Sequence, residues 1–158
     1  MFKGLSGKHA IVTGGSTLIG AGLVEAFVKA GATVTIADID AERGQAIADA
    51  CGKGAWFRKT DISDDLQLEA CVAESAKKFG RIDFVVNAAC VYVDDGINAS
   101  RSDWLTSMNV NLISAAMLVK AALPWMKKSG GGAVVNFTSI SSSVAQTGRW
   151  LYPTSKAA

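Results

Sequence analysis

Thr13-Gly14-Gly15-Ser16-Thr17-Leu18-Ile19-Gly20 is the stretch that decides the fold of this 158-residue chain. A short apolar run, His9–Val12, precedes it, and residues 23–28 carry apolar side chains at helical spacing up to Gly31. The sequence therefore predicts a strand, a glycine-rich turn and a helix in that order. In such a turn the backbone N–H groups and the positive end of the helix face a pyrophosphate, which favours dinucleotide binding.

A second predicted strand, Thr33–Ala37, ends on Asp38. A carboxylate at this distance from a glycine turn accepts hydrogen bonds from an adenosine ribose, and its charge repels a 2′-phosphate. An ordinary loop carboxylate would need no such role, but the preceding turn favours it. We therefore predict NAD rather than NADP as the cofactor.

Strands and helices alternate along the rest of the chain. After Asp38 the sequence predicts a helix over Ala41–Cys51, a strand over Ala55–Arg58, a helix from Ser63 or Asp64 to Gly80, a strand over Asp83–Asn87, a helix capped near Ser102 that stops before Pro124, and a strand over Ala133–Thr138. No signal for a β-hairpin is present, so we predict an α/β fold: a Rossmann-like, doubly wound parallel sheet with helices on both faces. The length indicates one dinucleotide-binding domain over residues 1–158.

Polar residues follow several of the predicted strands. Right-handed crossovers bring the carboxyl ends of parallel strands to one edge of the sheet. The glycine turn, Asp38, Asp61, Asn87 and Ser139 are therefore expected to share one crevice.

The stretch Tyr152-Pro153-Thr154-Ser155-Lys156 carries the sharpest chemical signal. If Tyr152 opens a helix, Lys156 lies about one turn later on the same face. A free tyrosine titrates near pH ~10, and a neighbouring ammonium favours the phenolate, so Tyr152 becomes a plausible acid and base. Pro153 agrees with a helix start, because a first-turn proline lacks only an N–H group that has no intrahelical partner. The pattern also arises by chance on helices, so the crevice supplies the context.

Composition excludes several classes of protein. With 49% hydrophobic and 19% charged residues the chain has an ordinary globular composition. Its formal net charge of +2 is mild, and no Lys/Arg run concentrates it, which argues against a nucleic-acid partner. The apolar segment Ala115–Met126 is interrupted by Lys120 and Pro124, so we predict no membrane span.

The chain has three cysteines and one histidine. Cys51, Cys71 and Cys90 form no C-x-x-C motif and leave an odd thiol, which favours a reducing, cytoplasmic location. His9, the only histidine, starts the first strand, away from the end where ligands bind, and is expected to be structural. We assign no metal site.

With these residues identified, the chain resembles the short-chain dehydrogenase/reductase family over essentially its whole length. The turn Thr13–Gly20 resembles the family's T-G-x-x-x-G-x-G cofactor motif, Asp38 its NAD-selecting aspartate, and Asp61-Ile62 the pair that flanks the adenine. Val86–Cys90 is similar to the family's N-N-A-G strand end.

The resemblance implies a set of site residues. The positions that match the family's catalytic Asn, Ser, Tyr and Lys are Asn111, Ser139, Tyr152 and Lys156. The positions implied to bind the cofactor are Gly14, Thr17, Leu18, Ile19, Gly20, Asp38, Asp61, Ile62, Asn87, Tyr152 and Lys156.

The implied reaction is reversible hydride transfer between NAD(H) and a secondary alcohol or its carbonyl form. Tyr152 would exchange the hydroxyl proton, Lys156 would support Tyr152 and hold the nicotinamide ribose, and Ser139 would bind the substrate oxygen. Asn111 would hold a water that links Lys156 to solvent. Arg149 and Trp150 form a further hypothesis, an anion site and an aromatic wall for the substrate.

Three departures from the family pattern stand out. Leu18 replaces the middle glycine, which normally lets the backbone approach the cofactor. Ala88 and Cys90 replace an asparagine and a glycine of the strand end, where we expect an effect on stability more than on chemistry. The chain also ends at Ala158, so we expect the dinucleotide-binding domain to be incomplete at its C-terminus and the full-length protein to form a homo-oligomer, a dimer or tetramer.

Two alternatives stay open. Leu18 and the early end of the chain also suit a catalytically silent nucleotide-binding sensor, or an inactive fragment of such an enzyme. Tyr152 and Lys156 together argue against the sensor, because a protein that only binds nucleotide needs neither.

Overall fold

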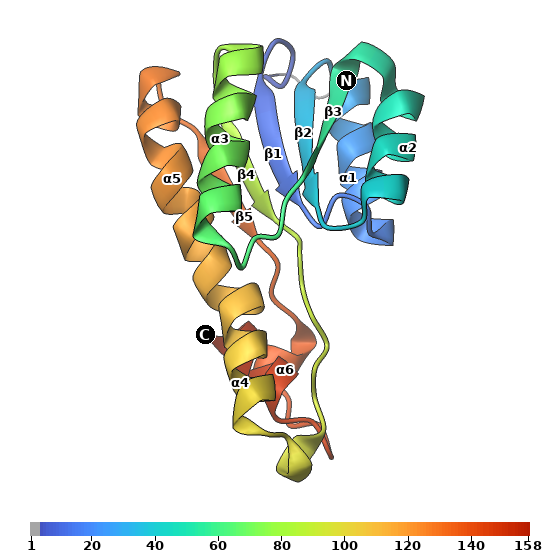
Figure 1. The fold of residues 1–158 in the computed structure, drawn as a ribbon, viewed down its shortest axis with the longest axis vertical. Coiled ribbons are helices and arrows are strands. Elements are labelled where there is room, and N and C mark those ends of the chain that lie inside the picture. The colour runs from blue at the N-terminus through green and yellow to red at the C-terminus, as the bar shows by residue number, and fades with distance from the viewer. Residues whose placement is uncertain (1–3) are drawn as a thin grey trace.

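Five parallel strands form one sheet in the computed structural model, which describes residues 4–158 (Figure 1). The first three residues of the predicted domain lie outside the described residues. The strands are β1 (His9–Thr13), β2 (Thr33–Asp38), β3 (Ala55–Lys59), β4 (Phe84–Asn87) and β5 (Ala133–Asn136). Their order in the sheet is β3-β2-β1-β4-β5, so the chain runs outward from β1 first to one edge and then to the other.

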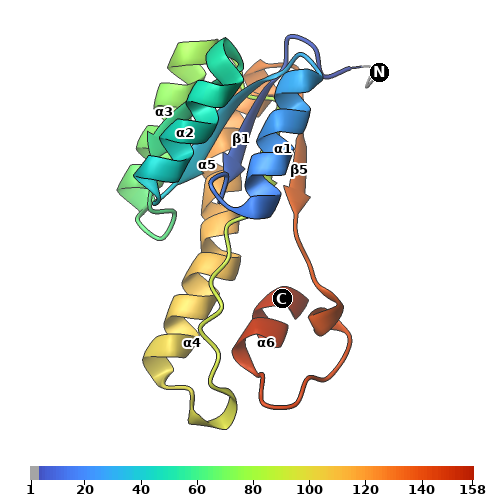
Figure 2. The same ribbon diagram turned by 90° about the vertical axis from the view of Figure 1, so that its right-hand side faces the viewer.

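Helices cover both faces of this sheet, α1 and α2 on one side and α3 and α5 on the other (Figures 1 and 2). The helices are α1 (Leu18–Lys29), α2 (Ala41–Cys51), α3 (Asp65–Phe79), α4 (Arg101–Met108), α5 (Ser114–Lys128) and α6 (Leu151–Ala157). Short 3-10 turns occur at Gly52–Gly54, Gly96–Asn98 and Ile140–Ser142. The predicted doubly wound α/β fold is confirmed.

Alternation along β1 explains the two layers of the core. Ile11 points to the side of α3 and α5, where it packs with Leu68 and Leu118. Ala10 and Val12 point to the other side, toward α1 and α2. Because β1 is central and buried on both faces, it reads as a continuous apolar run rather than an alternating one.

Local capping sets where the helices begin. Asp64, one of the two predicted caps, accepts hydrogen bonds from the backbone N–H groups of Leu66 and Gln67. The expected cap near Ser102 is instead Ser100, whose hydroxyl accepts from the Asp103 N–H while the Asp103 carboxylate accepts from the Ser100 N–H. This reciprocal pair satisfies two N–H groups of the helix end at once, which explains the earlier start.

The prediction that this helix stops before Pro124 is wrong. The helical run starting at Arg101 continues through a π-helical segment, Asn109–Ile113, into α5 and passes Pro124 to reach Lys128. A proline inside a helix removes one hydrogen bond and clashes with the preceding turn. Ala122 and Met126, on either side of Pro124, are both buried in the core beside α3, and this packing outweighs the local cost.

The continuous helix Arg101–Lys128 is also long and apolar enough to cross a membrane. Its apolar 18-residue window is 22% buried. The core helix of a soluble protein can be equally long and apolar, so one such helix does not establish a span. Here Leu118, Ala122 and Met126 pack against α3 and the sheet, which accounts for part of the apolar character.

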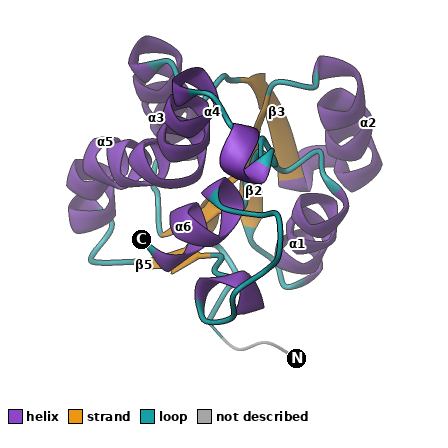
Figure 3. Ribbon diagram, turned by 90° about the horizontal axis from the view of Figure 1, so that it is seen from below, coloured by secondary structure: helices purple, strands orange, loops and turns teal. Residues whose placement is uncertain are grey.

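The lower half of the molecule extends beyond the carboxyl ends of the strands (Figures 1 and 2). It consists of α4, the connection Ala88–Ser100, the segment after β5, and α6. Seen from below, α6 lies under the carboxyl ends of the strands (Figure 3). The strand ends and α6 therefore face each other across the region predicted to bind the cofactor.

At the amino end of the central strand β1, on the side of the sheet away from α6, His9 lies fully buried in a polar network. Its Nδ1 is 2.8 Å from the Thr33 hydroxyl and its Nε2 is 2.8 Å from the Ser75 hydroxyl. The ring stacks on Phe79 with centroids 4.1 Å apart. Burial lowers the pKa of His9 to about 4, against the opposing effect of Asp83. His9 is structural, as expected, and stays neutral near pH 7.

This burial predicts a pH-dependent stability. Between pH 6.5, the ordinary pKa of histidine, and pH 4 the unfolded chain binds a proton at His9 that the folded chain does not. We expect the free energy of unfolding to fall by about 3 kcal/mol across that window as the pH drops. Urea unfolding of the His9→Gln variant should show a much flatter pH dependence than the unaltered protein. Equal slopes in the two proteins would contradict this account.

Candidate active site

The glycine turn between β1 and α1 is closed by its own hydrogen bonds. The Thr17 hydroxyl donates to the Gly14 carbonyl at 2.7 Å and accepts from the Gly20 N–H at 3.2 Å, which makes Thr17 the cap of α1. Gly14 has a φ of +65°, and a Cβ there would lie 2.7 Å from the backbone of Ala89. A Cβ on Gly20 would lie 2.1 Å from the Gly14 carbonyl oxygen. Both positions therefore require glycine.

This turn fits a pyrophosphate. The backbone N–H groups of Leu18 and Ile19 have no hydrogen-bond partner among residues 4–158, and they stand at the positive end of α1. Leu18 does not open the turn, because the Thr17 hydrogen bonds remain in place. Its side chain is instead 87% exposed to solvent.

Asp38 lies at the end of β2, beside this turn. Its carboxylate accepts hydrogen bonds from the Ser16 N–H at 2.9 Å and from the Asp40 N–H at 3.0 Å, and the residue is 9% exposed. These bonds use one lone pair of each oxygen and leave others for a ligand hydroxyl. The carboxylate is thus held rigidly against the turn, where the sequence predicted it.

Asp61 follows β3, and one oxygen of its carboxylate is used locally. Its Oδ1 accepts from the Ser63 N–H at 2.9 Å and from the Ser63 hydroxyl at 2.6 Å. The neighbouring Ile62 lines a cavity that the strand ends share with α5 and α6. Of Asp61 and Ile62, the two residues predicted to flank the adenine, Ile62 lines this cavity and Asp61 does not.

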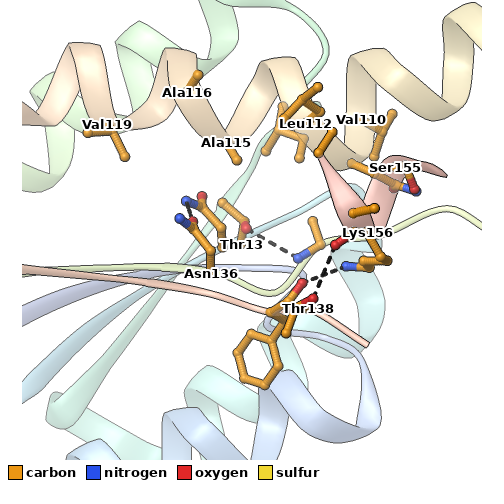
Figure 4. Close-up of a pocket in the computed structure, with 17 residues that line it drawn as sticks. Thr13, Val110, Leu112, Ala115, Ala116, Val119, Asn136, Thr138, Ser155 and Lys156 are labelled. Carbon is orange, nitrogen blue, oxygen red and sulfur yellow. Dashed lines mark hydrogen bonds between the residues drawn. The ribbon is translucent and has the colours of Figure 1, made fainter. Parts of the chain in front are cut away.

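That cavity has a volume of about 530 Å³ and lies between the carboxyl ends of the strands and the two helices (Figure 4). The predicted site residues among those lining it are Ile62, Asn87, Asn111 and Lys156. Thr13 and Asn136, which the sequence analysis did not assign to the site, line it too. Of the single residues expected to share one crevice, Asn87 lines this cavity, whereas Asp38 and Asp61 do not.

Hydrogen bonds between strand ends build the upper wall of the cavity. The Asn87 amide donates to the Asn136 side-chain oxygen at 2.7 Å, across the β4–β5 pair (Figure 4). The Thr13 hydroxyl accepts from the Ala89 N–H at 3.3 Å. The missing asparagine at Ala88 therefore leaves β1, β4 and β5 still joined at this edge.

Helix α6 supplies the lower wall through Lys156. The Lys156 ammonium donates to the Phe137 carbonyl at 3.0 Å, and the Thr138 hydroxyl donates to the Lys156 carbonyl at 3.1 Å. The Lys156 Nζ also lies 5.8 Å from the centroid of the Tyr152 ring. Tyr152 and Lys156 are therefore neighbours on one short helix, as the four-residue spacing predicted.

Cys90 lies close to the same ammonium. Burial raises the pKa of the Cys90 thiol, against the opposing effect of Lys156. The thiol is therefore neutral near pH 7 and does not neutralise the ammonium.

Tyr152 and Ser139 do not line the cavity. Tyr152 is half-buried, and its ring stacks on Tyr92 with centroids 4.8 Å apart. The Ser139 hydroxyl bonds locally, at 3.1 Å, with the Ser141 hydroxyl. Within residues 4–158 no hydrogen bond joins the side chains of Tyr152, Ser139 and Lys156.

Asn111 lies in the π-helical segment between α4 and α5. Its amide oxygen accepts from the Val91 N–H at 2.8 Å, and its amide nitrogen donates to the Val91 carbonyl and to the Ser155 hydroxyl, each at 3.0 Å. Both amide hydrogens are used, and one lone pair of the oxygen is left. Asn111 therefore ties the connection after β4 to α6.

Arg149 and Trp150 lie at a different place. They line a shallow cavity of about 360 Å³ together with Trp104. Neither lines the cavity that holds Lys156. Their suggested contact with substrate stays a prediction.

The sequence analysis missed Tyr92 and Asp94 in the connection after β4. Tyr92 packs on Tyr152, and the Asp94 carboxylate accepts from the Tyr152 N–H at 2.9 Å. No periodicity or motif marks them, since their partners lie more than fifty residues along the chain.

Comparisons with known proteins agree with this geometry. A family model described as short chain dehydrogenase matches residues 8–158. The chain is 33% identical over 157 residues to 3-oxoacyl-(acyl-carrier-protein) reductase FabG of Chlamydia pneumoniae, covering 97% of this chain and 63% of that protein. It is 34% identical over 155 residues to L-fucose dehydrogenase of Mus musculus, covering 97% of this chain and 56% of that protein.

A third relative is D-threitol dehydrogenase of Mycolicibacterium smegmatis, 33% identical over 156 residues, with 96% of this chain and 60% of that protein covered. The chain thus spans 56–63% of the length of these curated relatives.

The turn geometry makes a direct prediction about Gly20. We expect Gly20→Ala to abolish NADH binding and to lower the free energy of unfolding by roughly 1–3 kcal/mol, because the new Cβ overlaps the Gly14 carbonyl. Gly22→Ala on the same helix is the matched control, since nothing lies within 4 Å of a Cβ there. It should bind NADH normally and gain up to about 1 kcal/mol. Urea unfolding and NADH fluorescence titration test both variants, and equal behaviour of the two would contradict the prediction.

Proposed function

The chain belongs to the short-chain dehydrogenase family, and we propose on that premise that the protein transfers a hydride between NAD(H) and a secondary alcohol or its carbonyl form. The observation that carries the proposal is the position of Lys156. Lys156 lines one cavity together with Thr13 and Asn87. Thr13 ends β1 just before the glycine turn, and Asn87 ends the neighbouring strand β4. Tyr152, the group able to exchange a proton with an alcohol, is the neighbour of Lys156 on α6.

The substrate is a small-molecule alcohol or ketone in this proposal. The relatives are named for a 3-oxoacyl reductase, an L-fucose dehydrogenase and a D-threitol dehydrogenase. These names share the interconversion of a hydroxyl and a carbonyl group, while the carbon skeletons differ. The names of the relatives therefore support hydroxyl–carbonyl interconversion as the reaction class and do not select one substrate.

Tyr152, Lys156 and Ser139 have separate roles in the proposed reaction. Tyr152 accepts the hydroxyl proton during oxidation and donates it during reduction. The Lys156 ammonium stabilises negative charge that develops on the Tyr152 oxygen and offers hydrogen bonds to a ribose hydroxyl. Ser139, in the segment between β5 and α6, donates a hydrogen bond to the substrate oxygen.

Asn111 acts in this proposal mainly through position. Its amide hydrogens hold Val91 and Ser155, so it fixes the helix that carries Tyr152 and Lys156. The remaining lone pair of its amide oxygen is the place where a water that relays protons from Lys156 would bind.

The cofactor is held by groups that the fold brings to one edge. The N–H groups of Leu18 and Ile19 bind the pyrophosphate, Asp38 binds the adenosine ribose, and Ile62 packs beside the adenine. When bound, the nicotinamide supplies or accepts the hydride. The Leu18 side chain is exposed and the turn stays closed, so the N–H groups at the start of α1 remain available to the pyrophosphate.

A second candidate function is a nucleotide-binding sensor without turnover. Leu18 and the local hydrogen bond of Ser139 favour it, since both depart from what catalysis needs.

We also propose a homo-oligomeric, cytoplasmic protein. The free thiols of Cys51, Cys71 and Cys90 support the cytoplasmic location.

Replacement of Tyr152 separates the two functions. In the full-length protein we expect Tyr152→Phe to lower kcat about 10²–10⁴-fold, because the proton acceptor is lost, with the Kd for NADH changed little. Ser102→Ala is the control, because it removes an exposed hydroxyl on α4 away from Tyr152, and it should retain kcat within about fivefold. A panel of sugars, polyols and 3-oxoacyl thioesters, followed at 340 nm, measures turnover. NADH binding by the unaltered protein without turnover of any of these substrates would favour the sensor.

The Asp38 carboxylate predicts that the protein prefers NADH to NADPH. A fixed carboxylate repels a 2′-phosphate, so we expect NADH to bind at least about tenfold more tightly than NADPH. Asp38→Asn should reduce that ratio toward one, whereas Asp49→Asn, an exposed carboxylate on α2, should leave it unchanged. Fluorescence titration with both nucleotides tests this. Tighter binding of NADPH by the unaltered protein would contradict the assignment.

A further inference from the structure

Helix α6 carries both Tyr152 and Lys156 but is poorly able to hold itself. It contains seven residues, and Trp150 at its N-cap position provides no side-chain hydrogen bond. A helix of this length is marginal without outside partners, because its first N–H groups are unsatisfied and its nucleation is costly. Something outside α6 must therefore define the direction of the Tyr152 phenol.

Asp94 supplies the missing cap from another part of the chain. Its Oδ1 accepts from the Trp150 N–H at 3.0 Å, and its Oδ2 accepts from the Tyr152 N–H at 2.9 Å. The two bonds span 56 and 58 residues of sequence. Hydrogen bonds to a carboxylate are stronger than neutral ones, and negative charge is favoured at a helix N-terminus.

Asp94 is itself held in the conformation that these bonds require. Its Oδ1 also accepts from the Gly96 N–H at 3.1 Å. Burial works to raise the pKa of Asp94, but the hydrogen bonds from Trp150, Tyr152, Gly96 and Leu151 outweigh it and keep the pKa below its ordinary value. At neutral pH the group is a carboxylate, whose oxygens accept hydrogen bonds from the N–H groups of the helix end.

The same connection touches α6 at two more points. Tyr92 stacks on Tyr152, and Asn111 links Val91 to Ser155 on the next turn of α6. Gly96 lies against the segment before α6, where a Cβ would come 2.6 Å from the Gly148 carbonyl. Asp94 is the charged member of this set, and it accepts a hydrogen bond from the Tyr152 backbone N–H.

We propose that Asp94 is a positioning residue, which fixes the Tyr152 phenol for proton transfer by capping α6 from the connection between β4 and α4. The catalytic half of this inference rests on the proposed function. A positioning role predicts that the loss of Asp94 loosens the first turn of α6 and slows the chemical step. It also predicts a smaller change in NADH affinity than in kcat, because the pyrophosphate and adenosine-ribose sites at Leu18, Ile19 and Asp38 are built from other elements and α6 contributes only Lys156 to cofactor binding.

Asp94→Ala and Asp94→Asn test the inference in the full-length protein, with Asp95→Asn as the matched control. Asp95 is the exposed neighbour of Asp94, and its replacement removes the same charge. The asparagine variant keeps one acceptor oxygen and places an NH₂ group against the second N–H, so it should be intermediate. It also serves if the alanine variant fails to fold.

Amide hydrogen exchange of residues 150–152 is the first measurement, because it needs no turnover. We expect exchange to accelerate at least about tenfold in Asp94→Ala, less in Asp94→Asn, and not in Asp95→Asn, since an amide that loses its acceptor opens more often. Unchanged exchange in both Asp94 variants would overturn the capping role.

The second measurement is kcat on the best substrate of the panel, together with the Kd for NADH. We expect kcat to fall about 10–100-fold in Asp94→Ala, as small misplacements of catalytic groups do, with the Kd within about threefold. Faster exchange with an unchanged kcat would leave Asp94 structural and overturn the positioning role. If the unaltered protein turned over no substrate, the proposed function and this catalytic half would both fall, while the exchange result would still decide whether Asp94 holds α6.

Discussion

The register of β1 with its two neighbours is the constraint on which the site depends. Thr13, the last residue of β1, pairs with Ala37 on β2 and with Asn87 on β4, and Asn87 pairs in turn with Asn136 on β5. Four parallel strands therefore end at nearly one level. The glycine turn, Asp38 and the asparagine pair are side by side for that reason alone, before any contact with a ligand is considered.

The site is then completed from below by a separate unit. Lys156 reaches the segment after β5 through Phe137 and Thr138, while Asn111 and Asp94 hold α6 from the other side. In the proposed function the two parts have separate tasks. The sheet edge offers rigid backbone groups to a cofactor, and α6 carries Tyr152, the proposed proton-transferring side chain. The Ser139 hydroxyl bonds to the Ser141 hydroxyl and makes no hydrogen bond with Tyr152.

Much of this could be predicted from the sequence, because strands and helices follow local patterns. The helix Ala41–Cys51 was predicted with its observed bounds, and Asp38 and Asn87 end their strands at the predicted edge. The errors have tertiary causes. Core packing on both sides of Pro124 carries the helix past a residue that ends helices locally, and the π-helical turn at Asn111 leaves no mark in the hydrophobic pattern. Asp94 could not be found, because its partners are set by the docking of α6 and not by spacing along the chain.

A structure of the full-length protein with NADH bound would show whether the two halves of the site act on one cofactor. We expect the pyrophosphate at the Leu18 and Ile19 N–H groups, the adenosine ribose on Asp38, and the nicotinamide ribose within hydrogen-bond reach of Lys156. We expect the Tyr152 hydroxyl on the side of the nicotinamide ring that faces the substrate. A nicotinamide bound away from the cavity of Thr13, Asn87 and Lys156, or a Tyr152 hydroxyl on the far side of α6 from it, would contradict the account.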